Sequence, residues 1–128
     1  MKVLAKIVVG ILMFATFASA VAYTNATVKG NYSILLTSSA TPTALLGLLK
    51  FDGAGNVSMI YAQPGGFTGT FSGTYAVDSN GTGMITFSSQ SPAVTMDFVL
   101  SSVVNGNAKK LQLAVSSGGD GVGTATHQ

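Results

Sequence analysis

Apolar residues recur at every second position through most of this sequence, in short segments separated by Gly, Asn, Asp, Ser and Pro. The most regular segment covers residues 67–77, where Phe71, Tyr75 and Val77 share one face and threonine, serine and alanine occupy the other. Alternation with a period of two is typical of a β-strand that has one buried and one solvated face. The sequence therefore predicts an all-β protein.

Eight segments of this kind are expected, and they cover residues 30–37, 43–51, 57–63, 67–77, 83–88, 94–101, 109–116 and 121–128. The segment at 43–51 is the least regular, because its leucines would also suit a short helix. A strand is preferred there because a Gly-rich turn follows it.

The connections between the segments indicate how the strands are arranged. The segments at 52–56, 78–81, 105–107 and 117–121 are rich in Asp, Asn and Gly, which are typical of hairpin turns. Tight hairpins favour an antiparallel up-and-down barrel of about eight strands, which closes on itself and leaves no edge strand exposed. A β-sandwich is the alternative, since 38–42 and 90–92 offer somewhat longer connections.

The first 22 residues have the three-part plan of a secretory signal peptide. Lys2 and Lys6 precede an apolar run of 11 residues at 7–17, and small residues follow at 18–22. The run is shorter than the roughly 20 residues that a membrane-spanning helix needs, so a retained anchor is the weaker interpretation. Cleavage after Ala20 or Ala22 would remove this signal-peptide helix. One β domain at 23–128 would then be secreted to the periplasm or the cell exterior.

Charge and cysteine content exclude several classes of protein. Without the two signal lysines, the chain has four lysines and four aspartates, and the sequence has no arginine, no glutamate and no cysteine. A neutral surface without arginine cannot supply the clustered cations that nucleic-acid binding requires. We therefore expect no nucleic-acid partner, and we expect stability to come from packing and backbone pairing rather than from disulfides.

Two turn motifs resemble those of a known group of proteins. Residues 49–57 read LKFDGAGNV and residues 73–83 read GTYAVDSNGTG. They resemble uncharacterised small secreted bacterial proteins that carry an FDGxGNV hairpin followed by a GTYxVxxxGTG hairpin, and the likeness covers most of the chain after the signal. The resemblance implies a lipocalin-like or allene-oxide-cyclase-like barrel in a bacterial envelope or outside the cell. The group has no established activity, so the resemblance implies no functional residue.

Residues suited to catalysis or metal binding are scarce. His127 is the only histidine and lies one residue from the C-terminus, so it is interpreted as a frayed surface residue. Asp52, Asp78 and Asp120 adjoin Gly-rich turns, where aspartate normally caps its own backbone, whereas Asp97 lies mid-strand on the solvated face. Zinc would need cysteine or clustered histidine. We therefore expect no enzyme, no metal site and no cofactor.

The aromatic residues are the remaining candidates for a function. An eight-stranded barrel is either filled with side chains or holds one small ligand. Glycines at 47, 69 and 73 are expected to leave room on the inner face. The aromatic side chains expected to point inward are those of Tyr32, Phe51, Phe71, Tyr75, Phe87 and Phe98. All of these except Phe51 are taken as candidate ligand-binding residues.

The sequence supports two non-enzymatic functions. One is a secreted barrel that binds a small apolar or aromatic ligand in its interior, and the other is an envelope or extracellular structural or interaction protein that acts through its outer surface over a filled core. A hollow interior of roughly several hundred Å³ would favour the first function. Exposure of Leu46 and Leu48 would favour the second. A nearly neutral surface also makes a homo-oligomer a candidate partner arrangement.

Overall fold

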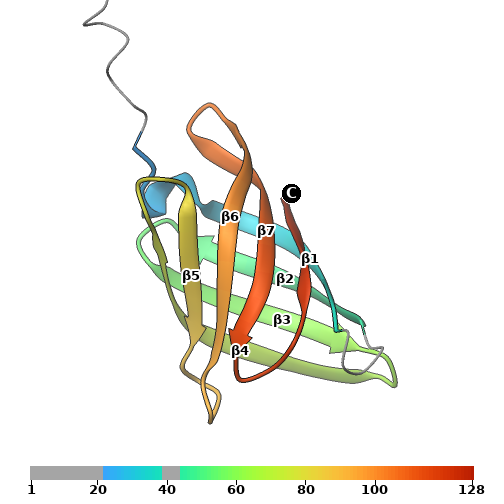
Figure 1. Cartoon of the computed structure of the whole chain (residues 1–128). Coiled ribbons are helices and arrows are strands. Elements are labelled where there is room, and N and C mark those ends of the chain that lie inside the picture. The colour runs from blue at the N-terminus through green and yellow to red at the C-terminus, as the bar shows by residue number, and fades with distance from the viewer. Residues whose placement is uncertain (1–21, 39–43) are drawn as a thin grey trace, which may run out of the picture.

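The eight predicted strands form and pair in sequence order around a closed antiparallel barrel (Figure 1). The computed structural model describes residues 22–38 and 44–128, so the predicted signal-peptide helix lies outside the described residues. Because β1 pairs with β8 as well as with β2, the sheet has no free edge, and the β-sandwich alternative is wrong. The strands are β1 (Lys29–Thr37), β2 (Ala44–Asp52), β3 (Asn56–Gln63), β4 (Phe67–Val77), β5 (Thr82–Phe87), β6 (Val94–Val104), β7 (Asn107–Ser117) and β8 (Val122–His127).

Strand positions agree with the sequence pattern, and their ends differ where a turn is tighter than expected. The leucine-rich segment is strand β2, as preferred over a helix. Strands β6 and β7 run beyond their predicted ends because Asn105 and Gly106 both have positive φ, at 52° and 73°. Two consecutive residues with positive φ make the short hairpin turn whose twist matches that of the flanking strands.

One carboxylate organises the turn between β2 and β3. Asp52 Oδ2 accepts a hydrogen bond from the side-chain amide of Asn56 at 2.7 Å, and its Oδ1 accepts from the backbone N–H groups of Asn56 and Ala54 at 2.9 and 2.8 Å. These hydrogen bonds, the side-chain bond from Asn56 first among them, favour the ionised form and lower the pKa of Asp52 to about 2. The prediction that this aspartate caps its own turn is confirmed.

The inward-facing side chains fill the barrel. Along β4, Tyr75 is buried while Thr74 and Ala76 on either side of it are exposed, as the alternation predicts. A slip of one residue would reverse these faces, so the register of the strand is well determined. The largest fully buried side chains are those of Tyr32, Phe87, Phe98, Leu49, Met59, Ile85, Met96 and Leu111.

One end of the barrel is closed by residues 23–28, which we call the plug. It contains the short 3-10 turn η1 (Asn25–Thr27), which contacts β4 and β7 (Figure 1). Asn25 Oδ1 accepts a hydrogen bond from the backbone N–H of Val77 at 2.8 Å, and Val28 is fully buried. The opposite end, which we call the mouth, carries the β3–β4, β5–β6 and β7–β8 turns (Figure 1).

Candidate ligand-binding site

The predicted ligand-binding residues Tyr32 and Tyr75 belong to the packed core near the plug. Both rings meet Phe51 edge to face, with ring centroids 5.3 Å apart for Tyr32 and 4.8 Å apart for Tyr75. The hydroxyl of Tyr32 donates to the carbonyl of Ala108 at 2.6 Å, and that of Tyr75 donates to the carbonyl of Val28 at 2.7 Å. These hydroxyls hold the closed end of the barrel together, so they are not free to bind a ligand.

Both phenols remain protonated over the physiological pH range. Burial raises the pKa of Tyr32 to about 12, and burial also raises the pKa of Tyr75. The cause is that the phenolate loses solvation in the interior more than the neutral phenol does. Neither residue is therefore suited to act as an acid or base near neutral pH.

The other three predicted residues differ in their surroundings. Phe87 and Phe98 are 0% and 2% exposed. Phe71 is only partly buried, and its ring centroid lies 5.4 Å from that of Phe87 and 4.9 Å from that of Tyr61. The structure therefore does not gather the five predicted residues around one ligand.

The glycines that were expected to leave room inside the barrel do not do so. A Cβ atom on Gly69 would lie 2.5 Å from the Tyr61 hydroxyl oxygen, and one on Gly47 would lie 3.0 Å from the Ile34 side chain. At Gly73 a Cβ atom would collide with the backbone of β5. The expectation was wrong because neighbouring side chains and backbone occupy the space that each missing side chain frees.

A small pocket remains at the mouth, and we call it the mouth pocket. Its volume is about 180 Å³, which is below the roughly 300–1,000 Å³ of typical small-molecule sites. Asp120 lies at its rim with the β7–β8 turn. Its apolar lining comes from Leu36, Leu45, Met59, Phe71, Val94, Met96 and Val115.

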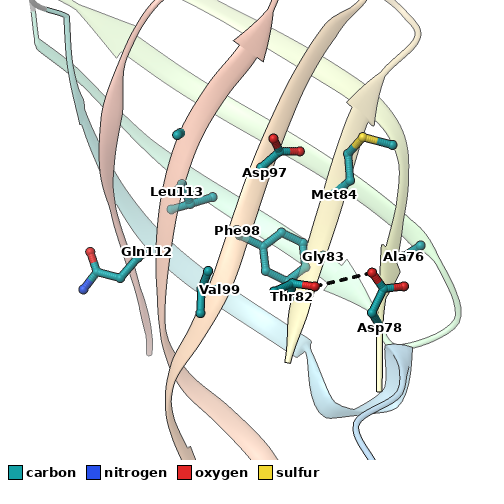
Figure 2. A pocket seen from close by; sticks show the side chains of 11 residues that line it. Ala76, Asp78, Thr82, Gly83, Met84, Asp97, Phe98, Val99, Gln112 and Leu113 are labelled. Carbon is teal, nitrogen blue, oxygen red and sulfur yellow. Dashed lines mark hydrogen bonds between the residues drawn. The ribbon is translucent and has the colours of Figure 1, made fainter. Parts of the chain in front are cut away.

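A larger hollow, which we call the outer groove, lies on the outside of the barrel across β4 to β7 (Figure 2). Its volume is about 620 Å³, within the range of small-molecule sites. Most of its side chains point to solvent rather than to the core. The lining residues are Ala76, Asp78, Thr82, Gly83, Met84, Asp97, Phe98, Val99, Gln112, Leu113 and Ala114.

The strand register sets the central row of the outer groove. Ala76 pairs with Met84, Met84 pairs with Asp97, and Asp97 pairs with Ala114. Directly opposed residues of antiparallel strands place their Cβ atoms about 4.5–5.5 Å apart. The carboxylate of Asp97 therefore lies in a row whose other members are all apolar (Figure 2).

Phe98 connects the outer groove to the core. Its side chain is buried, and it is also part of the groove lining. The ring lies against Gly83, where an added Cβ atom would overlap it. Of the five predicted ligand-binding residues, Phe98 thus lies at the outer groove and Phe71 at the mouth pocket, while the other three line neither.

The outer groove is acidic. Asp78 and Asp97 are the ionisable residues of its lining, which contains no lysine. The Thr82 hydroxyl donates to Asp78 Oδ2 at 3.4 Å (Figure 2). Asp97 forms no hydrogen bond or ion pair with another described residue.

Other chemistry-bearing residues are dispersed. His127 was expected to fray, but it lies in β8 opposite Tyr32 of β1, and the two ring centroids are 5.0 Å apart, so that interpretation was wrong. Residues 22–38 and 44–128 contain no group of three or more His or Asp side chains arranged to hold a metal ion. In the same residues, no helix has the length and apolar character to span a membrane.

The chain matches no protein-family model, no curated protein and no solved structure. The assignment of a site therefore depends on the geometry of the barrel alone.

Sequence reasoning missed the outer groove, although it left a signal. Met84 and Val99 occupy solvent-facing positions of their strands, where the alternation predicts polar residues, and they are 48% and 50% exposed. Ala76 and Ala114 occupy similar positions. Apolar residues at successive outward positions of neighbouring strands would have indicated an outer apolar surface.

Proposed function

We propose that this protein is a secreted, non-enzymatic binding protein that works through the outer surface of its barrel, with the outer groove as its ligand site. The observation that carries this proposal is where the space lies. The groove offers about 620 Å³, whereas the mouth pocket offers about 180 Å³ above an interior filled with side chains. Of these two hollows, the outer groove is the one in the volume range of typical small-molecule sites. A hollow of about 470 Å³ beside the plug also falls in this range, but it is smaller than the groove.

The exposed apolar side chains of the groove supply a driving force for binding. Met84 and Val99 each leave about half of their surface in water. A ligand with an apolar body would remove this surface from water, at roughly 25 cal/mol for each Å² buried. We therefore assign the groove to small molecules with an aromatic or alkyl portion.

A second set of exposed apolar side chains also supports a surface role. Leu46 is 61% exposed on β2, and Leu35 opposite it on β1 is 45% exposed. Ile60 on β3 and Val122 on β8 are 50% and 61% exposed. Groups of exposed apolar residues typically mark interaction surfaces. Of the two leucines whose exposure was expected of a protein that acts through its outside, Leu46 is exposed, whereas Leu48 is only partly exposed.

The absence of an enzymatic role remains part of the proposal. Acid–base catalysis needs titratable groups within hydrogen-bond reach of one substrate. Here His127 packs on Tyr32 and Asp52 is engaged in its own turn. Asp78 and Asp97 both line the outer groove, but Asp78 accepts a hydrogen bond from Thr82 and no hydrogen bond joins the two carboxyl groups. These positions give no convergent acid–base pair.

The mouth pocket supports a second candidate function, the binding of a small apolar ligand inside the barrel. The observation that favours it is the mostly apolar lining, which includes Phe71, Met59 and Met96. Its volume limits the ligand to a few heavy atoms unless side chains at the mouth move aside.

Three methionines distinguish the two sites. The predicted signal peptide contains Met1 and Met13, so the secreted chain would keep Met59, Met84 and Met96. Met84 lines the outer groove, whereas Met59 and Met96 line the mouth pocket. A protein labelled with ¹³C at its methionine methyl groups therefore carries one NMR probe in the first site and two in the second.

The experiment is a titration of the labelled secreted chain with a panel of aromatic and alkyl compounds. We expect the Met84 methyl signal to shift with compound concentration while the Met59 and Met96 signals stay in place. Ala114→Phe, which puts a ring into the groove, should abolish the shift, and Ala62→Phe on the outer face of β3 is the matched control. Shifts at Met59 and Met96 alone would favour the mouth pocket, and no shift at any methionine would refute both sites.

A further inference from the structure

We infer that the outer groove selects a small organic cation, whose ammonium group pairs with the carboxylate of Asp97 while its apolar body covers Met84 and Val99. This inference rests on the proposed function of the groove and adds the chemical class of its ligand. It follows from the negative charges of the groove lining, from the absence of a hydrogen-bond partner for the Asp97 carboxylate among the described residues, and from the apolar residues beside Asp97.

The charges of the lining favour a cation and disfavour an anion. Asp78 and Asp97 contribute two negative charges, and the lining contains no positive charge that would neutralise them. Asp97 is exposed, so its attraction for a cation is that of a surface carboxylate and weakens as salt is added. A carboxylate ligand would meet two like charges.

Asp97 is distinguished from the other aspartates by its place in the fold. Asp52 closes the β2–β3 turn, Asp78 follows β4 and accepts from Thr82, and Asp120 accepts from the Ser38 hydroxyl at 3.1 Å. Asp97 alone lies in the middle of a strand, and no described residue donates a hydrogen bond to it. Its two oxygens are acceptors only, so they are open to a donor from outside the protein.

Neither the strand nor its packing requires an aspartate at position 97. Aspartate is disfavoured in strands, and the residues opposite it on β5 and β7 are Met84 and Ala114. An opposite charge across the strand pair would stabilise the carboxylate, but neither neighbour carries one. An ammonium group of a bound ligand would supply this missing partner.

The remainder of the groove suits the apolar part of such a cation. The thioether of Met84 is flexible and polarisable, and it makes favourable contacts with aromatic rings. Val99 opposes Thr82 across the β5–β6 pair and lies two residues along the same face from Asp97. A ligand whose ammonium group reaches Asp97 can therefore rest its aryl or alkyl group on both Met84 and Val99.

The test uses three ligands that share one body and differ in charge: 4-phenylbutylamine, 4-phenylbutan-1-ol and 4-phenylbutyrate. Their affinities are measured from the Met84 methyl signal of the labelled secreted chain. We expect the amine to bind about fivefold more tightly than the alcohol at low salt, and the carboxylate to bind most weakly. Raising the salt concentration to about 0.5 M should weaken the binding of the amine and leave the affinity of the alcohol nearly unchanged, because salt screens only the charge contribution.

Variants locate the charge that matters. Asp97→Asn keeps the shape of the side chain and should make the amine and the alcohol bind equally. Asp120→Asn removes the same charge at the mouth and should leave the preference for the amine intact. A thermal unfolding midpoint close to that of the unaltered protein verifies that each variant is folded, and the salt dependence of the unaltered protein needs no variant.

The outcomes separate this inference from the function on which it rests. Equal binding of amine and alcohol at Met84 would overturn the inference and leave the groove as a site for neutral apolar ligands. Preference for the amine that survives Asp97→Asn would also overturn it, since another group would then hold the cation. Failure of all three ligands to shift Met84 would overturn the inference, and the proposed function fails as well if no compound of the wider panel shifts it.

Discussion

Tyr75→Phe should loosen the plug while leaving the rest of the barrel in place. The substitution removes the hydroxyl that lies 2.7 Å from the carbonyl of Val28 and 3.0 Å from that of Asn25. Val28 is fully buried, so its carbonyl would be left without this donor. An unsatisfied buried acceptor costs about 1–3 kcal/mol. For a domain of this size, a loss of about 2 kcal/mol corresponds to a fall in Tm of roughly 10 °C.

Two measurements check this prediction. Thermal or urea unfolding gives the loss of stability, and hydrogen exchange of the Val77 amide, which donates to Asn25 Oδ1 at 2.8 Å, reports on the plug. Tyr61→Phe removes the same atom near the mouth, where the hydroxyl has no hydrogen bond to another described residue, and should change stability by less than about 0.5 kcal/mol. An equal loss in both variants, or unchanged exchange at Val77 in Tyr75→Phe, would refute the role assigned to this hydroxyl.

Two further predictions concern the backbone and the acid limit of stability. Gly73→Ala should lower the free energy of unfolding by more than about 3 kcal/mol or prevent folding, since the added Cβ would collide with the backbone of β5. The Cβ added by Gly119→Ala would lie 3.6 Å from a side chain, so this variant should be nearly as stable as the unaltered protein in urea unfolding. The pKa of Asp52 is lowered to about 2 in the folded protein, so its contribution to stability is complete above its unfolded pKa of about 4 and is lost as the pH falls toward 2. Asp52→Asn, which still offers an oxygen to the N–H groups of the turn, should flatten the unfolding free energy across that pH range, and an unchanged slope would contradict the assignment.

The strands and their faces were predictable from the sequence because they depend on local patterns. Alternation placed Tyr75 inside and Thr74 outside, and the Asp- and Gly-rich turns placed the hairpins. The closed barrel followed from the short connections, since adjacent antiparallel strands need only a tight turn. The predicted ends of β6 and β7 were less accurate, because the positive φ of Asn105 allows a tight turn and the two strands continue up to it.

The plug was not predictable in the same way. Residues 23–28 show no regular alternation, and the hydrogen bonds that hold them come from β4, about 50 residues further along the chain. His127 was misinterpreted for a related reason. Its position next to the C-terminus suggested fraying, but closure of the barrel pairs β8 with β1 and places the ring on Tyr32.

The candidate site depends on curvature, which the period-two pattern does not describe. The pattern assigns each residue to an inner or outer face, but it does not say where the outer face is hollow. Close approach of strands is one source of curvature, and Gly83 of the groove lining permits it, since a Cβ atom there would lie 2.6 Å from the backbone oxygen of Ala76 on β4. Glycine on the inner face was taken as a sign of space inside the barrel, whereas the structure uses it to bring strands together. The same residue type thus helps to fill the interior and to shape the exterior, which is why the proposed ligand site lies outside a barrel whose sequence pointed to its lumen.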